Sequence, residues 1–359
     1  MPERLPPGVY VEELPAGVRR IEAVSTSTAA FIGVGARRAA PVLISSFAEF
    51  GRTVGADVGG FLPLAVRGFF ENGGTRCYVT VASPPGVIDA ALDELRRERF
   101  SMLCCPDEHE CPDAAATMVA YCEQRTDVVC LLQSPRPPVA AESHVPPVRS
   151  GYSAYYYPWL AVPSLDGRST VLVPPSGHVC GVYARNDTER GVHRAPAGVR
   201  VLGVDHVSHD VTSSECDALV ARGINVIRTL PDKGVVVWSA RTTSLDTEWH
   251  YINVRRLLAL VEESIGTGTR WVVFEPNGPM LWTKMSRAIQ DFLMNLWTSG
   301  ALVGSRPQSA FFVRCDRTTM TQDDVDNGRV IAVIGLAVLR PAEFVILRIT
   351  AQSARRACD

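Results

Sequence analysis

The sequence predicts an α/β (α+β) protein with two domains. Its 359 residues suffice for about two domains of ordinary size. Strand-like and helix-like segments alternate through residues 28–133, which favours a mostly parallel sheet with crossover helices. A stretch rich in proline and glycine follows, and a second series of amphipathic helices and apolar strands begins near residue 206.

Composition excludes several classes of protein. Hydrophobic residues make up 46% and charged residues 21%, which is typical of a globular chain. A net charge of −2 and a pI near 6.4 give no sign of a nucleic-acid partner. No apolar run reaches the ~18–20 residues that span a bilayer. The opening MPERLPPGVYVEE lacks the apolar core of a signal peptide. We therefore expect synthesis and assembly in the cytoplasm, without direct membrane insertion.

Residues 1–27 are predicted to form an extended arm. Three prolines among the first seven residues disfavour a helix. Residues 9–14 and 18–24 look extended, yet their charges leave too few apolar positions for a packed strand. Either the segment is a frayed terminus or it reaches another subunit. Fully extended, residues 9–22 would span about 45 Å, more than the roughly 38 Å diameter of a compact 150-residue domain.

The first domain is expected to cover residues 28–205. Its predicted strands are 28–34, 76–82, 100–104 and 127–133, and its predicted helices are 61–71, 87–97 and 113–124. Five prolines make residues 134–149 a loop or linker, and residues 152–159 form an aromatic run. From there to Gly198, high proline and glycine density predicts short strands and ordered loops.

The second domain is expected to cover residues 206–359. The predicted elements are a helix at 215–222, a hairpin of strands 224–230 and 235–238, a helix capped by Asp246 and running to Ile265, a strand at 271–274, a helix from Pro279 to about residue 299, and strands at 310–315, 330–338 and 343–350. Strands 310–315 and 330–338 are apolar on both faces, so we expect them in the centre of a sheet.

Three clusters suggest metal ligands at first sight. In DHVSHD (205–210), His206 and His209 would share a face only in a helix, and the flanking residues look extended. The spacing in CCPDEHEC (104–111) matches no strong zinc pattern. After the aspartates before Gly328, the position where a calcium loop needs glutamate is Ile334. We interpret the clusters as a polar loop, a strand end and a turn, and expect no metal.

Two further motifs suggest an enzyme, and both are incomplete. Gly33 and Gly35 follow a strand, but the third glycine of a dinucleotide fingerprint is Arg38. Ser176 lies in PPSGH, and the rigid Pro174 replaces the first glycine of a nucleophile elbow. We therefore expect no catalytic residue and no cofactor. A cytosolic α/β enzyme with a convergent polar pocket remains the less favoured alternative.

Long motifs carry a resemblance to a known family. They are PGVYVEE (7–13), PPSGHVCGVYARNDTERGVHRAPAG (174–198), GINVIRTLPDKGVVVWSARTT (223–243), EWHYINVRRLLALVEESI (248–265), WVVFEPNGPMLW (271–282) and GLAVLRPAEFVILRITAQ (335–352). With these the chain resembles the tail sheath proteins of contractile phage tails and contractile injection systems, in their short form. Residues 84–150 carry little of the resemblance.

The resemblance implies a structural function and no enzyme activity, nucleotide or metal. Such subunits polymerise as stacked hexameric rings around an inner tube and contract to drive the tube through a target envelope. Residues 206–359, with the arm 1–27, would form an inner, tube-facing domain, and residues 28–205 an outer domain. Terminal arms would add strands to the sheets of neighbouring subunits. The implied linking residues are Val9, Tyr10, Val11, Val18 and Ile21 in the arm, and Phe344, Ile346 and Ile349 in a linking strand at 343–352.

The resemblance also implies partners. They are copies of the chain itself, paralogous sheath proteins, an inner tube protein, and baseplate and cap or terminator proteins. The finished product would be a phage tail or a tail-like particle released from the cell. Lys284 and Arg287, on the polar face of helix 279–299, are candidates to contact the tube. Another structural component of the same machine, such as a tube or baseplate protein, is an alternative.

Overall fold

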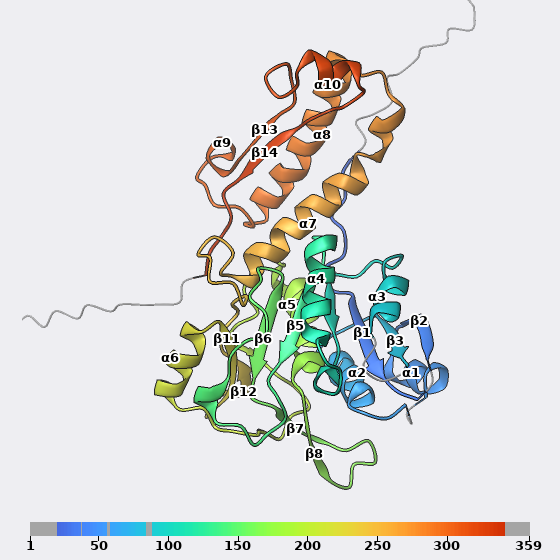
Figure 1. Cartoon of the computed structure of the whole chain (residues 1–359). Coiled ribbons are helices and arrows are strands. Elements are labelled where there is room, and N and C mark those ends of the chain that lie inside the picture. The colour runs from blue at the N-terminus through green and yellow to red at the C-terminus, as the bar shows by residue number, and fades with distance from the viewer. Residues whose placement is uncertain (1–19, 37, 56–57, 84–87, 342–359) are drawn as a thin grey trace, which may run out of the picture.

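The protein has two stacked parts in its computed structural model, which describes residues 20–341 except 37, 56–57 and 84–87 (Figure 1). One part contains a large mixed sheet with helices on both faces. The other contains two long helices, α7 and α8, and a small sheet. The mixed α/β architecture is as predicted.

The large sheet has nine strands in the order β2-β3-β1-β4-β5-β6-β11-β12-β9. Their bounds are Ala29–Val34 (β1), Ala39–Ile44 (β2), Cys77–Ala82 (β3), Met102–Cys104 (β4), Val129–Gln133 (β5), Ser153–Tyr157 (β6), Val199–Arg200 (β9), Ile224–Leu230 (β11) and Gly234–Val237 (β12). The pairs from β3 to β11 are parallel, and the pairs β2–β3, β11–β12 and β12–β9 are antiparallel. The mostly parallel sheet is thereby confirmed.

Helices cover both faces of this sheet. They are Phe47–Thr53 (α1), Leu62–Glu71 (α2), Asp89–Leu95 (α3), Ala114–Arg125 (α4), Ser176–Arg190 (α5) and Ser213–Ala221 (α6), with short 3₁₀ turns at Glu108–Glu110 (η1) and Ala141–Ser143 (η2). Helices α1, α2 and α5 share one apolar cluster with the sheet, and α3, α4 and α6 share the other. Strand side chains alternate between the clusters, as Phe31 and Ile32 show.

Helix α5 corrects one prediction, because residues 176–190 were expected to be short strands or loops. Small residues let this helix approach α2 closely. A Cβ at Gly177 would lie 2.6 Å from the Cα of Ala65, and one at Gly181 would lie 2.4 Å from the carbonyl oxygen of Phe69. Tertiary packing therefore outweighs the poor helix propensity of the glycines. Short strands occur beside it: Leu160–Pro163 (β7), Thr170–Val173 (β8) and His206–Val207 (β10) form a three-stranded sheet.

The large sheet continues past the domain boundary expected at residue 205. Strand β11 pairs in parallel with β6, Ile224 opposite Tyr155, and its hairpin partner β12 follows. Residues 224–237 therefore belong with the large sheet and not with the second part. The chain leaves the sheet near Arg241, which forms a bridge with Tyr251 just before α7. From here on, residues 28–243 are called the sheet part and residues 244–341 the C-terminal part.

The C-terminal part consists of Ile252–Gly268 (α7), Arg270–Phe274 (η3), Pro279–Thr298 (α8), Pro307–Ala310 (α9), Phe311–Arg314 (β13), Gln322–Asp326 (α10) and Val333–Leu336 (β14). Helix α8 begins at Pro279 and buries Leu281, Ile289 and Phe292, as predicted. Helix α7 begins at Ile252 and not at Asp246, because Asp246 instead accepts a hydrogen bond from Glu248 N in a turn.

Two strand predictions in this part are wrong. Residues 271–274 form the 3₁₀ helix η3 instead of a strand, and Val273 and Phe274 are 75% and 93% exposed. Strands β13 and β14 are not central. Among the described residues they pair only with each other, and Phe312 and Val333 are exposed. Apolar sequence indicated burial, but the described residues do not cover these side chains.

Candidate functional site

The segment at residues 20–28 lies between the two parts of the molecule. Ile21 is buried in the apolar cluster that α7 and α8 share. Val24 N donates a hydrogen bond to Ser264 Oγ of α7 (3.1 Å). On the sheet side, Ser101 N donates to Thr28 O (3.0 Å), and the Ser101 hydroxyl donates to Thr26 O. The segment is therefore attached to both parts before the chain enters β1.

A buried ion pair links the two parts next to this segment. Together with Thr26 of the segment, it is called the joint below. Arg256 of α7 forms two hydrogen bonds to the carboxylate of Asp187 on α5, at 2.9 and 2.6 Å, and both side chains are 3% exposed. Arg256 also donates to Thr26 O (2.9 Å), and the Thr26 hydroxyl donates to Asp187 (2.6 Å). Burial acts to lower the pKa of Arg256, but the charge of Asp187 more than reverses this, so the pKa is raised.

Aromatic side chains surround the two arginines of α7. The Arg256 guanidinium lies 4.8 Å from the ring centroid of Tyr183, whose hydroxyl is 2.5 Å from that of Tyr156. Arg255 lies 3.6 Å from the ring centroid of Trp249 and 4.1 Å from that of Tyr152. Cation–π contacts of desolvated arginines contribute about 2 kcal/mol each. The contact between the parts therefore combines a buried ion pair with hydrogen bonds and cation–π contacts.

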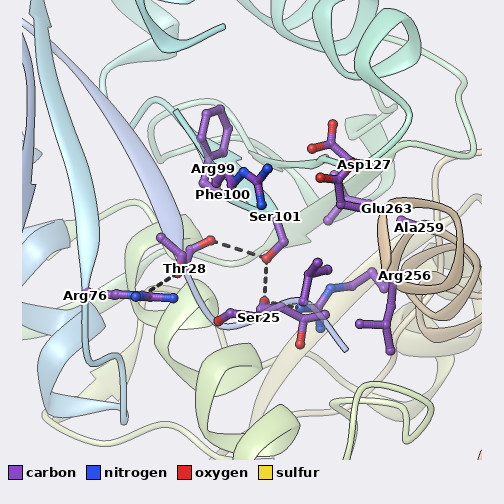
Figure 2. A pocket seen from close by; sticks show the side chains of 14 residues that line it. Ser25, Thr28, Arg76, Arg99, Phe100, Ser101, Asp127, Arg256, Ala259 and Glu263 are labelled. Atoms are coloured by element: carbon purple, nitrogen blue, oxygen red, sulfur yellow. Dashed lines mark hydrogen bonds between the residues drawn. The ribbon is translucent and has the colours of Figure 1, made fainter. Parts of the chain in front are cut away.

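A cleft of about 200 Å³ opens beside this joint, at the amino ends of the parallel strands (Figure 2). Several of its polar wall residues are already engaged: Arg76 donates to the Thr28 hydroxyl (3.0 Å), and Arg256 is held by Asp187. A third wall residue, Asp127, pairs with Arg125 at 2.6 Å. Much of the polar lining of the cleft is therefore bonded within the chain.

The carboxyl ends of the parallel strands are where an enzyme of this topology would bind its ligand. In doubly wound sheets, anionic ligands bind where the strand order reverses, which here is between β1 and β4. The chain's own Asp107 carboxylate occupies this place and accepts a hydrogen bond from Phe61 N (2.7 Å), at the start of α2. Burial raises the pKa of Asp107 to about 6, which the backbone N–H donors only partly offset. A side chain of the protein itself, Asp107, thus occupies the position where this topology binds ligands.

The clusters singled out in the sequence have ordinary surroundings. His206 lies in β10, and His209 hydrogen-bonds Glu215 at 3.2 Å. Cys104 is buried at the end of β4, and burial raises its thiol pKa well above the ordinary value. The described residues contain no group of three or more metal-ligating side chains. Ser176 and His178 are fully buried in α5, and burial lowers the pKa of His178 to about 3. No helix in the described ranges is long and apolar enough to cross a membrane.

Of the eight expected linking residues, Ile21 alone is described, and its side chain is buried in its own subunit. The other seven lie outside the described residues: Val9, Tyr10, Val11, Val18, Phe344, Ile346 and Ile349. The tube-contact candidates Lys284 and Arg287 are exposed on α8, opposite its buried stripe. Their exposure agrees with the helical pattern, and their contact with a tube stays a prediction.

Sequence reasoning missed the buried joint. Its members are distant in the chain, with Arg256 lying 69 residues from Asp187 and 230 from Thr26. One signal was present. Arg256 follows Ile252 by four residues and precedes Leu260 by four, so it stands within the apolar stripe of α7. A charged residue at such a position needs a buried partner.

Comparisons with known proteins give the family. Residues 83–243 match the phage tail sheath protein central domain, and residues 244–352 match the phage tail sheath C-terminal domain. Among curated relatives, the tail sheath protein of Vibrio phage KVP40 is 26% identical over 50% of this chain and 27% of its own. A putative prophage major tail sheath protein of Pseudomonas aeruginosa is 24% identical over 47% of this chain and 44% of its own. The matches thus span less than half of these relatives.

Solved structures match over nearly the whole length. The anti-feeding prophage (AFP) helical sheath in its contracted state is 34% identical, with a TM-score of 0.81 over 96% of this chain and 98% of its own. The PVC sheath complex of an extracellular contractile injection system, also contracted, is 30% identical, with a TM-score of 0.83 over 98% of both chains. Sequence motifs and fold agree, and the chain belongs to the tail sheath family of contractile phage tails and contractile injection systems.

Proposed function

We propose that this chain is a structural sheath subunit that polymerises as stacked hexameric rings around an inner tube. Contraction of the sheath would then drive the tube through a target envelope. The observation that carries this proposal is the incomplete small sheet of the C-terminal part. Strands β13 and β14 carry exposed apolar side chains, and further strands from neighbouring subunits would cover them.

Both ends of the described chain support linkage between subunits. Ile21 and Val24 hold the start of the described chain against α7, directly after residues 1–19. Asn253 at the start of α7 donates a hydrogen bond to Leu339 O (3.2 Å), which fixes the place where residues 342–359 leave. Terminal segments anchored in this way would connect neighbouring subunits while each subunit moves as a rigid body.

The buried joint suits a subunit that transmits force. The Arg256–Asp187 pair ties the sheet part to the C-terminal part, and Thr26 ties the N-terminal segment to both. We infer that the C-terminal part faces the tube through Lys284 and Arg287, with the sheet part outside. The inner tube, baseplate and cap proteins and any paralogous sheath proteins are proposed partners on the same basis.

A second candidate is a role at the baseplate of the same machine. The chain is 33% identical to a chain solved within the AFP baseplate, with a TM-score of 0.81 over 98% of this chain and all of the other. A sheath subunit that also meets the baseplate would satisfy both similarities.

Electron microscopy of the purified full-length protein tests the function. We expect hollow tubular sheaths. Deletion of residues 1–19, which keeps the buried Ile21, should leave folded monomers or ring fragments, whereas deletion of residues 1–6 alone, ahead of the expected strand, should leave assembly intact. Long sheaths from the 1–19 deletion would contradict linkage by the arm. A monomer that never assembles, even with tube protein, would contradict the sheath function.

A further inference from the structure

An apolar groove of about 510 Å³ runs along the sheet part, away from the joint. Helix α6 forms one wall through Cys216, Val220 and its neighbours. The residues that follow β12 form the other wall, with Trp238 and Ala240. Trp238 is 43% exposed, a large value for the largest apolar side chain, and Arg228 stacks 5.2 Å from its ring centroid. The groove thus offers an aromatic surface and small apolar side chains to a ligand.

The described chain ends at this groove. Pro341 is one of the residues that line it. The position of the chain just before is fixed, since Asn253 donates hydrogen bonds to both Leu339 O (3.2 Å) and His193 O (2.9 Å). The last described residue, Pro341, therefore lies at the groove. Nine further residues reach about 30 Å when extended, which is enough to follow the groove.

The sequence of residues 342–350 fits such a site. In an extended conformation Val345, Leu347 and Ile349 share one face, which is apolar beyond Glu343 at its start. The groove has one exposed acidic residue in its wall, Asp217, and the segment contains Arg348. An uncovered apolar strand in a free subunit is also an aggregation hazard, so a subunit that awaits assembly needs a place to shelter it.

We propose that, in the unassembled subunit, residues 342–350 bind in the groove between α6 and Trp238 of their own chain. They leave it when the subunit joins a sheath. The second step rests on the proposed linking role of this segment, but the first concerns the free subunit alone. The groove would therefore act as an intramolecular docking site that keeps the linking strand from pairing before a neighbour is present.

Hydrogen exchange on the monomeric full-length chain tests the docking. A chain that stops after Pro341 should exchange about tenfold faster in peptides covering residues 216–221 and 236–241. A synthetic peptide of residues 342–352, added to the truncated chain, should restore the protection at the same peptides. Equal exchange in the full-length and truncated chains would overturn the proposal. Protection by the added peptide of β13–β14 instead of the groove would also overturn it.

Matched variants test the face that enters the groove. Leu347→Asp should raise exchange at the groove as far as truncation does, while Ile346→Asp, on the opposite face, should raise it little. Equal effects of the two variants would contradict the assigned face. Electron microscopy of the same proteins tests the linking role separately from docking in the groove. Normal sheaths from the truncated chain would refute the linking role, while the exchange result still decides whether the groove holds the segment.

Discussion

The sheet part and the C-terminal part differ in how completely they bury their own apolar residues. Strands β1, β4, β5 and β6 are buried along their whole lengths, with helices against both faces. In the C-terminal part, β13 and β14 are mixtures of buried, half-buried and exposed positions, and Phe274 and Met280 are 93% and 76% exposed. The centre of the large sheet is therefore covered within the described residues, whereas the small sheet of the C-terminal part is not.

From this difference we propose that assembly uses the C-terminal part. Large exposed apolar side chains gathered on one region of a protein mark interaction sites. The two parts must still move together, and the buried Arg256–Asp187 pair holds them. In the described residues, a sheet with a covered centre is thus linked through this ion pair to a C-terminal part with exposed apolar side chains. The following predictions test this contrast, in descending order of their effect on the free energy of unfolding.

Asp187→Leu should have the largest effect. It leaves the Arg256 charge buried without its partner, which costs about 3–5 kcal/mol. Urea unfolding of the monomer measures this loss. The double variant Asp187→Leu with Arg256→Met is the control and should recover most of the stability, because an apolar pair leaves no unpaired charge. A loss below about 1 kcal/mol for Asp187→Leu alone would refute a tight joint between the parts.

Gly177→Ala tests the close packing of the sheet part. A methyl group there meets Ala65 at 2.6 Å, so we expect a loss of about 1–3 kcal/mol. Gly266→Ala in α7 is the matched control. Nothing lies within 4 Å of its Cβ position, so the higher helix propensity of alanine should stabilise the protein by up to about 1 kcal/mol. Thermal unfolding compares the two, and equal shifts would mean that α2 and α5 are not closely packed.

Glu108→Gln should remove a pH dependence of the sheet part. Burial raises the pKa of Glu108 to about 8. Because the folded state holds this proton more tightly than the unfolded state, stability is greatest below the unfolded pKa of 4.5 and falls as pH rises towards 8. Glutamine keeps the acceptor for Gln133 N and carries no charge. We expect a clear gain in the free energy of unfolding at pH 8 and little gain at pH 4. An equal gain at both values would contradict the raised pKa.

Charge reversal of Lys284 and Arg287 should have the smallest effect on stability. Both are exposed on α8, so the free energy of unfolding should change by less than about 0.5 kcal/mol. Assembly of sheath on tubes should nevertheless weaken, as counted by electron microscopy. Arg52→Glu on α1 of the sheet part is the control and should assemble normally. If the Lys284 and Arg287 variant also forms extended sheaths normally on tubes, these residues do not make the tube contact.

The sequence by itself determined elements with a clear apolar period. Alternation in residues 76–82 and the helical stripe from Pro279 specify β3 and α8, because local burial patterns follow local geometry. The same stripe placed Lys284 and Arg287 on the exposed face. The long motifs also identified the family.

Only the tertiary structure decided the rest. Helix α5 exists because glycines allow contact with α2, although glycine disfavours a helix locally. Residues 271–274 are aromatic or β-branched, yet no strand in the described ranges pairs with them. The joint of Thr26, Asp187 and Arg256 depends on residues far apart in sequence, which only folding brings together. The apolar period of the sequence predicts which side chains favour burial. The tertiary packing determines which of them are buried.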